Sequence, residues 1–263
     1  MGSEMCIRDS GGVVKVLRYA EGQLEVVAHN YNGSPSAGWV EDLNGDGVQE
    51  VVFDQTDPYV FCYACGVRRA AFEILRWDGA ALQPVVLSPL GEDISAEIRT
   101  INDQAVQFAN AGLWLDAGAA AYALRDADNE TALWNATHID LVSQYRALAA
   151  DSAYPLMTRM FNGDYFGAVG PFVGLQPAQM FGFEGPLLQG TVADGWTDTM
   201  FPEIVETTTA ALAVKPDEAG ALFLRGWAKF FLNEPTALED LARAAELAPQ
   251  NSTFAGARDF LTP

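Results

Sequence analysis

The acidic, glycine-rich stretch over residues 39–53 constrains the fold of this chain more than any other. It reads WVEDLNGDGVQEVVF and carries side-chain oxygens at Asp42, Asn44 and Asp46, with a further carboxylate at Glu50. Oxygens at every second residue, interleaved with glycines where the backbone must turn sharply, suit a hard cation such as calcium. The spacing therefore predicts a calcium-binding loop.

The residues on either side of the loop decide which kind of calcium loop it is. An EF-hand needs a helix on both sides and a bidentate Glu at the twelfth place of the loop, which here is Phe53. Instead, Val48, Val51 and Val52 are β-formers, so a strand follows the acidic residues. We therefore expect a loop between two strands. The alternative without a metal is a tight Asn-Gly turn with solvated carboxylates.

The motif D-x-N-G-D-G-x-x-E followed by a strand resembles the calcium loop of FG-GAP/VCBS repeats, the blade modules of integrin-type β-propellers. The resemblance implies that calcium is bound by side-chain oxygens and by the backbone carbonyl of Val48. Its side-chain ligands would be Asp42, Asn44, Asp46 and Glu50. That family often has Asp where this chain has Glu50.

Residues 11–90 as a whole predict antiparallel β structure. Residues 13–19 and 24–28 flank one turn, and residues 70–77 and 82–87 flank another, so both pairs are expected to form hairpins. The two hairpins share a pattern of Leu-Arg, an aromatic residue, an acidic Gly turn and Leu, which indicates a repeated blade-like unit. A closed propeller needs several such units, so we expect partial propeller-like blades at the end of a longer array.

The period of the apolar residues changes at residues 88–93, where Pro89 and Gly91 predict a boundary. Residues 94–263 are rich in Ala and Leu, with helical spacing over much of their length. The predicted fold class is therefore α+β in separate domains. A β domain over residues 11–90 would precede an all-α domain over residues 94–263.

Residues 219–249 resemble a tetratricopeptide repeat. Gly226 allows close helix packing, Ala237 is small where the two helices cross, and Pro249 ends the second helix. Residues 251–261 would form the capping helix of such an array. An ordinary helical bundle is the alternative.

Helical-hairpin repeats leave an extended concave surface, and the resemblance implies a protein or peptide partner on it. Arg225 and Lys229 lie four residues apart on the first helix of the clearest repeat. They form a possible partner-binding pair for a carboxylate, with Arg225 offering bidentate geometry. The alternative is that both cations offset the nearby acids Glu218, Glu239 and Asp240.

The balance of charges excludes two classes of partner. The chain has a formal net charge of −20, which repels nucleic acid and anionic membrane surfaces. No apolar run approaches the roughly 20 residues of a membrane-spanning helix. We also find no glycine-rich phosphate loop, nucleophile elbow or metalloprotease motif, so the sequence predicts a protein that is not an enzyme.

Cys62 and Cys65 occur as Cys-Tyr-Ala-Cys. A zinc site usually needs four ligands, and His29 and His138 are the only histidines of the chain. We therefore predict a possible disulfide between Cys62 and Cys65 in an exported protein, extracellular or periplasmic. Two free buried thiols are the alternative.

Residues 1–10 read MGSEMCIRDS, which matches the translation of a transposase adapter used in sequencing libraries, and we leave them out of the fold argument. We interpret the remainder as part of a larger exported protein, a non-enzymatic, calcium-binding scaffold for protein interactions. One alternative is an accessory region of an exported enzyme whose catalytic domain lies upstream. Another is a carbohydrate-binding module that uses Tyr19, Trp39 and Trp77.

Overall fold

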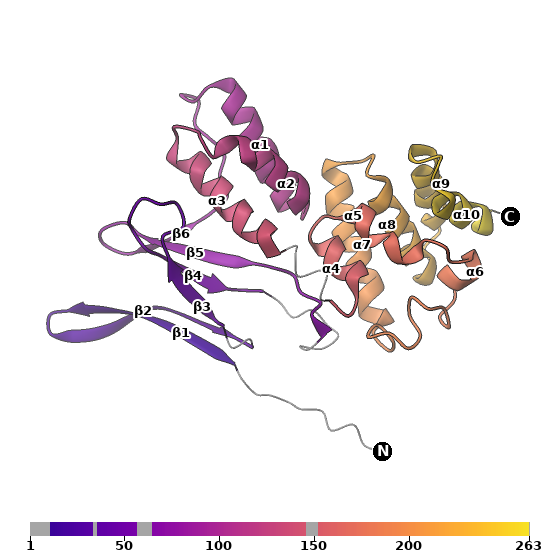
Figure 1. Ribbon diagram of the computed structural model, residues 1–263, viewed down its shortest axis with the longest axis horizontal. Coiled ribbons are helices and arrows are strands. Elements are labelled where there is room, and N and C mark those ends of the chain that lie inside the picture. The colour runs from indigo at the N-terminus through magenta and orange to yellow at the C-terminus, as the bar shows by residue number, and fades with distance from the viewer. Residues whose placement is uncertain (1–10, 34–35, 57–64, 146–151, 263) are drawn as a thin grey trace, which may run out of the picture.

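The computed structural model describes residues 11–33, 36–56, 65–145 and 152–262. Two antiparallel sheets form the N-terminal part, and helices form most of the remainder (Figure 1). The first sheet contains only β1 and β2, and the second has the strand order β3-β4-β5-β6. The strands are β1 (Gly12–Ala20), β2 (Gln23–Asn32), β3 (Gly38–Glu41), β4 (Glu50–Asp54), β5 (Phe72–Trp77) and β6 (Leu82–Val85).

Strand β4 is one of the two interior strands of the larger sheet. All five of its residues are buried, because its apolar side chains alternate between two covered faces. Val52 packs with Ile74 on one face, and Val51 and Phe53 pack with Leu75 on the other. The acidic loop joins β3 to β4, which confirms that it connects two strands.

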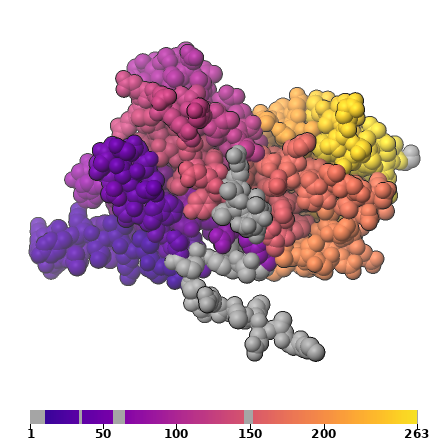
Figure 2. Space-filling model, viewed as in Figure 1, coloured from indigo at the N-terminus to yellow at the C-terminus, as the bar shows by residue number. Residues whose placement is uncertain are grey.

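The β1–β2 hairpin packs against one face of this sheet. Val14, Val16 and Ala28 pack against the cluster that contains Val51 and Phe53. The hairpin projects from the rest of the molecule, as the indigo atoms in Figure 2 show. Six other large apolar side chains of the hairpin are exposed: Val13, Leu17, Tyr19, Leu24, Val26 and Tyr31.

The helices follow from Ala96 onwards. The α-helices are α1 (Ala96–Asn110), α2 (Trp114–Ala121), α3 (Glu130–Gln144), α4 (Pro155–Phe161), α5 (Tyr165–Ala168), α6 (Pro177–Met180), α7 (Thr197–Val214), α8 (Ala219–Phe231), α9 (Ala237–Leu247) and α10 (Ser252–Leu261). Short 3-10 turns, η2 (Tyr122–Leu124) and η4 (Gly170–Phe172), connect some of them. Over the ranges that the structure describes, no helix combines the length and the apolar character needed to cross a membrane.

Helix α3 covers the second face of the four-stranded sheet. Trp134, Leu141 and Val142 pack with Val52 and Ile74 in one apolar cluster. Figure 1 shows α1, α2 and α3 together above the sheet, beside the larger helical group from α4 to α10. The helical group has its own core, in which Trp227 is fully buried.

Helices α8, α9 and α10 lie over the residues expected for a helical hairpin and its following helix. A Cβ atom on Gly226 would lie 2.8 Å from the Leu241 Cγ atom and 2.9 Å from the Ala237 carbonyl oxygen. This explains why glycine is needed where α8 and α9 approach each other. Asn251 caps α10, since its side chain accepts hydrogen bonds from the N–H groups of Thr253 and Phe254.

The order of antiparallel strands followed by helices is confirmed. Between the last strand and the first helix, the chain changes class near the boundary expected at residues 88–93. Packing crosses that boundary, however, because α3 completes the core of the sheet. The division into separate domains therefore stays a prediction.

The described strands form open sheets and no closed propeller. The two hairpins expected to repeat each other belong to different sheets.

Candidate metal centre

The acidic loop wraps around the carboxylate of Asp42. One oxygen, Oδ1, accepts hydrogen bonds from the N–H groups of Gly45 at 2.8 Å and Asp46 at 3.1 Å. The other, Oδ2, accepts one from Gly47 at 2.9 Å. Gly45 and Gly47 have φ values of 76° and 86°, which place both in the left-handed region that glycine adopts without strain. The glycines therefore let the backbone point its N–H groups at Asp42.

Asp46 and Asn44 form the second half of the loop. Asp46 Oδ1 accepts the N–H of Val48 at 2.7 Å, and Asn44 Nδ2 donates to Asp46 Oδ2 at 3.0 Å. Both hydrogen bonds lower the pKa of Asp46, and the one from the Val48 N–H has the larger effect. The lowered pKa favours the ionised carboxylate of Asp46, which is exposed.

Glu50 lies at the base of the loop and is fully buried. Its Oε2 atom accepts the N–H of Leu43 at 3.1 Å, whereas Oε1 has no hydrogen-bond partner among the described residues. Burial raises the pKa of Glu50, and the charges of Asp46 and Asp42 raise it further, while Leu43 and Arg76 oppose the shift. Buried polar atoms without a partner are rare in folded proteins, so this oxygen needs an explanation.

Arg76 is the cation of this site, and the sequence alone did not single it out. It comes from β5, and its guanidinium contacts Asp46 at 3.4 Å and pairs with Glu130 at the start of α3. The same group lies over the ring of Trp134. Only the pairing of β4 with β5 brings Arg76 beside the loop, and the strand register is not visible in sequence spacing.

The donor set fits calcium in its chemistry, although its side chains are not arranged around a common point. Across the described part of the chain, no group of three or more His, Cys, Asp or Glu side chains is placed to hold a metal ion. The reason is that the carboxylates of Asp42 and Asp46 are turned towards the N–H groups of their own loop. The Glu50 carboxylate differs from these two, because one of its buried oxygens, Oε1, has no hydrogen-bond partner among the described residues. Carboxylate, amide and backbone carbonyl oxygens are the ligands that calcium takes.

The predicted partner-binding pair is occupied within the protein. Arg225 and Lys229 both pair with Asp240 of α9, at 2.6 Å and 2.8 Å. Their side chains are only 19% and 13% exposed, so little of either charge faces the solvent. These ion pairs favour the alternative in which the cations offset a nearby acid. A role in partner binding stays a prediction.

The two cysteines of the predicted disulfide can be followed only in part. Cys65 is buried and disulfide-bonded. Cys62 lies outside the described residues, so the pairing of Cys62 with Cys65 stays a prediction.

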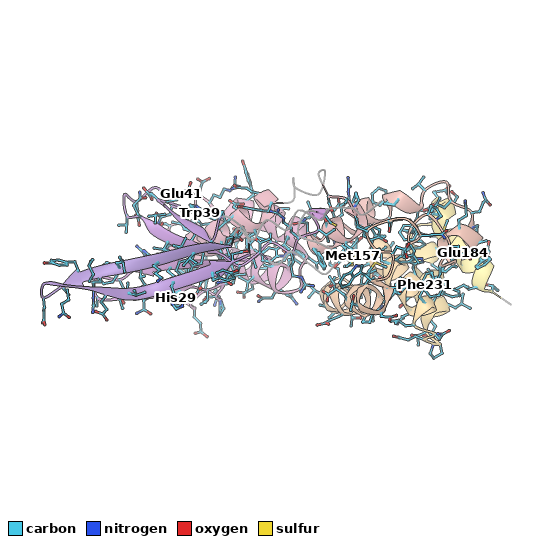
Figure 3. All side chains as sticks on the ribbon, turned by 90° about the horizontal axis from the view of Figure 1, so that it is seen from below. His29, Trp39, Glu41, Met157, Glu184 and Phe231 are labelled. Carbon is cyan, nitrogen blue, oxygen red and sulfur yellow. The ribbon has the colours of Figure 1, made fainter. Side chains whose placement is uncertain are left out.

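The three aromatic residues of the carbohydrate alternative do not form one platform. Tyr19 lies on the separate hairpin. Trp39 sits beside Val52 in the register of the sheet and packs edge-on against Phe72, while its Nε1 donates to Glu41 at 2.8 Å (Figure 3). Side chains alternate along a strand, and Trp77 is an odd number of residues from Phe72, so its side chain belongs to the opposite face.

Comparisons with known protein families, with curated proteins and with solved structures return no match. The function proposed for this chain therefore rests on its own residues.

Proposed function

We propose that this chain is a non-enzymatic, calcium-binding scaffold for protein interactions. The observation that supports calcium most is the Glu50 side chain, which is fully buried and keeps Oε1 without a partner among the described residues. A buried carboxylate is costly unless it is paired, hydrogen-bonded or bound to a metal. A calcium ion in the loop supplies the missing partner.

The charges around Glu50 support the same proposal. Asp42 and Asp46 add two carboxylates, and Arg76 offsets only part of their charge. Carboxylates that share a site repel one another, and a divalent cation relieves this repulsion. Calcium is favoured over a transition metal because the donors are all oxygens, without His or Cys.

The arrangement of elements supports the two resemblances. A four-stranded antiparallel sheet has the size of one propeller blade, and the acidic loop joins its first two strands. Helices α7, α8, α9 and α10 each pack against the next, as the helices of hairpin repeats do. We therefore assign calcium to a blade-like β module and a protein or peptide partner to the tetratricopeptide-like helices.

Export to the extracellular or periplasmic space completes the proposal. Cys65 is disulfide-bonded, and disulfides persist mainly in oxidising compartments. An exposed calcium loop also needs a compartment in which the concentration of free calcium is high, and this favours export.

Thermal melting tests the calcium proposal directly. The wild-type chain and the Asp46→Ala variant are melted with calcium and with a chelator. We expect calcium to stabilise the wild type by about 2.7 kcal/mol when its concentration is a hundredfold above the dissociation constant. The Asp46→Ala variant should lose most of this shift, because it lacks a ligand.

The control is Asp78→Ala, which removes a carboxylate from another exposed turn. Asp78 accepts the N–H groups of Ala80 and Ala81 and is not part of the loop. This variant should melt lower than the wild type but keep the calcium shift. Equal melting temperatures of the wild type with calcium and with chelator would contradict the proposal.

A further inference from the structure

We infer that Arg76 is a built-in counter-ion of the calcium loop, which competes with the metal for Asp46 and links the loop to helix α3 through Glu130. This inference rests on the proposed function. It assigns to Arg76 the control of calcium affinity, and to Glu130 a positioning role that acts through Arg76.

The first support is that Arg76 holds two carboxylates from different parts of the fold. Its Nη2 atom lies 3.4 Å from Asp46 Oδ2, and its Nη1 atom donates to Glu130 at the start of α3. Among the described side chains, no other Arg or Lys pairs with Asp46 or with the remaining acids of the loop. Arg76 is therefore the positive charge that the described part of the chain brings to the loop.

The second support is the sheet register. Strands β4 and β5 are antiparallel with Val51 opposite Leu75, and the same register continued by one residue places Arg76 opposite Glu50. The strand that carries Glu50 and the strand that carries Arg76 are therefore neighbours in the sheet next to the loop. The guanidinium is held on the α3 side of the sheet, where it lies 5.4 Å from the centre of the Trp134 ring.

The third support is that the Arg76 side chain has room to move away from the loop. A cavity of about 560 Å3 lies between β5, β6 and the first turns of α3. Arg76, Glu130 and Trp134 are among its lining residues. Glu130 is 69% exposed, so the Arg76–Glu130 pair can adjust without disturbing the core.

These contacts predict competition between calcium and Arg76. A divalent ion at the loop repels a guanidinium that shares Asp46 with it, because like charges a few ångströms apart interact unfavourably. Arg76 then gives up its long contact with Asp46 and keeps Glu130 as its partner. Arg76 therefore weakens calcium binding, and Glu130 limits this effect by holding Arg76 away from the loop. By thermodynamic reciprocity, calcium strengthens the attachment of α3 to the sheet.

Calorimetric titration of the full chain with calcium tests the inference. The Arg76→Met variant should bind calcium about three- to tenfold more tightly than the wild type, since one positive charge beside the ion is removed. Arg76→Lys keeps the charge and should stay close to the wild type. Glu130→Gln should bind about two- to threefold more weakly, because Arg76 is released towards Asp46.

A double-mutant cycle separates a positioning role of Glu130 from a general charge effect. If Glu130 acts through Arg76, then Glu130→Gln should change calcium affinity little in the Arg76→Met background. The matched control is Arg18→Met, which removes an exposed arginine whose partner is Glu25 on the β1–β2 hairpin. It should leave calcium affinity near the wild-type value.

Several outcomes would overturn the inference. Equal affinities of wild type and Arg76→Met, or an equal gain in Arg18→Met, would show that Arg76 has no special role while calcium binding itself stands. If no variant binds calcium, the proposed function fails as well. If Arg76→Met does not fold, Glu130→Gln is compared with the wild type instead, because Glu130 is exposed and its substitution should leave the fold intact. An unchanged calcium affinity of Glu130→Gln would then overturn the inference.

Discussion

Glu50 is the residue on which the proposed calcium site mainly rests. In an ordinary turn the carboxylates are solvated, but Glu50 is fully buried and one of its oxygens is unpaired among the described residues. Ionised, it is costly to bury without a cation, and with a cation it becomes a ligand. The same side chain should therefore have opposite effects on stability in the two conditions.

We predict that the effect of Glu50→Gln on the free energy of unfolding has opposite signs in chelator and in calcium. In chelator, the neutral amide keeps the bond from the Leu43 N–H and removes a buried charge, which should raise stability by about 1–2 kcal/mol. In calcium, the variant should be less stable than the wild type, because the wild type gains stability from calcium and the variant lacks one of its ligands. Chemical denaturation under both conditions measures this. Glu73→Gln, an exposed change on β5, should have little effect in either. A variant that is less stable in chelator would count against the assignment.

At the scale of elements, Asp240 joins helices α8 and α9. It lies between Arg225 and Lys229, and its side chain is only 8% exposed. A group of three charges that is largely buried is sensitive to the loss of one partner, because the others remain with uncompensated charge. The ion pairs therefore explain why two cations are placed together on α8 without requiring a partner molecule.

We predict that Asp240→Asn lowers the free energy of unfolding by about 2–4 kcal/mol, since two nearly buried cations lose their carboxylate. Asp259→Asn is the matched control, because Asp259 pairs with Arg258 on the surface of α10 and should matter by less than about 1 kcal/mol. Urea denaturation of both variants measures the difference. Equal costs would show that the Asp240 cluster is no more than a surface ion pair.

At the scale of the whole molecule, α3 connects the acidic loop to the helices. Its apolar face completes the core of the sheet, and its first residue, Glu130, pairs with Arg76. Asn135 of α3 also donates hydrogen bonds to the Ser88 carbonyl and to Asn102 of α1, both at 2.6 Å. The predicted boundary segment is therefore held at Ser88, whose carbonyl also accepts a hydrogen bond from Asn102 of α1 at 3.0 Å.

We predict that calcium slows hydrogen exchange in the β3–β4–β5 sheet and in α3 but leaves α8, α9 and α10 unchanged. The physical reason is that local opening of α3 exposes the same core as opening of the sheet, whereas the last helices pack in another cluster. Exchange followed by mass spectrometry, with calcium and with chelator, measures this. Protection confined to the loop, or spread evenly over the chain, would disagree with coupling through α3.

The sequence by itself determined the features that depend on neighbouring residues. The strand after the acidic loop follows from the run of β-formers, and the loop shape follows from glycines at Gly45 and Gly47 that adopt positive φ. The hairpin α8–α9 and the helix after it follow from apolar spacing and from Gly226. Such signals are local, because backbone sterics and side-chain periodicity act over a few residues.

Only the tertiary structure decided which distant residues meet. Arg76 pairs with Glu130 across 54 positions of sequence, and Arg225 meets Asp240 across 15. The two similar hairpins also belong to different sheets, because strand pairing depends on which apolar faces can be buried together. The loop residues could therefore be predicted from spacing, whereas Arg76, the cation that contacts Asp46, could not. Its position depends on the register between β4 and β5 and on the packing of α3 over both.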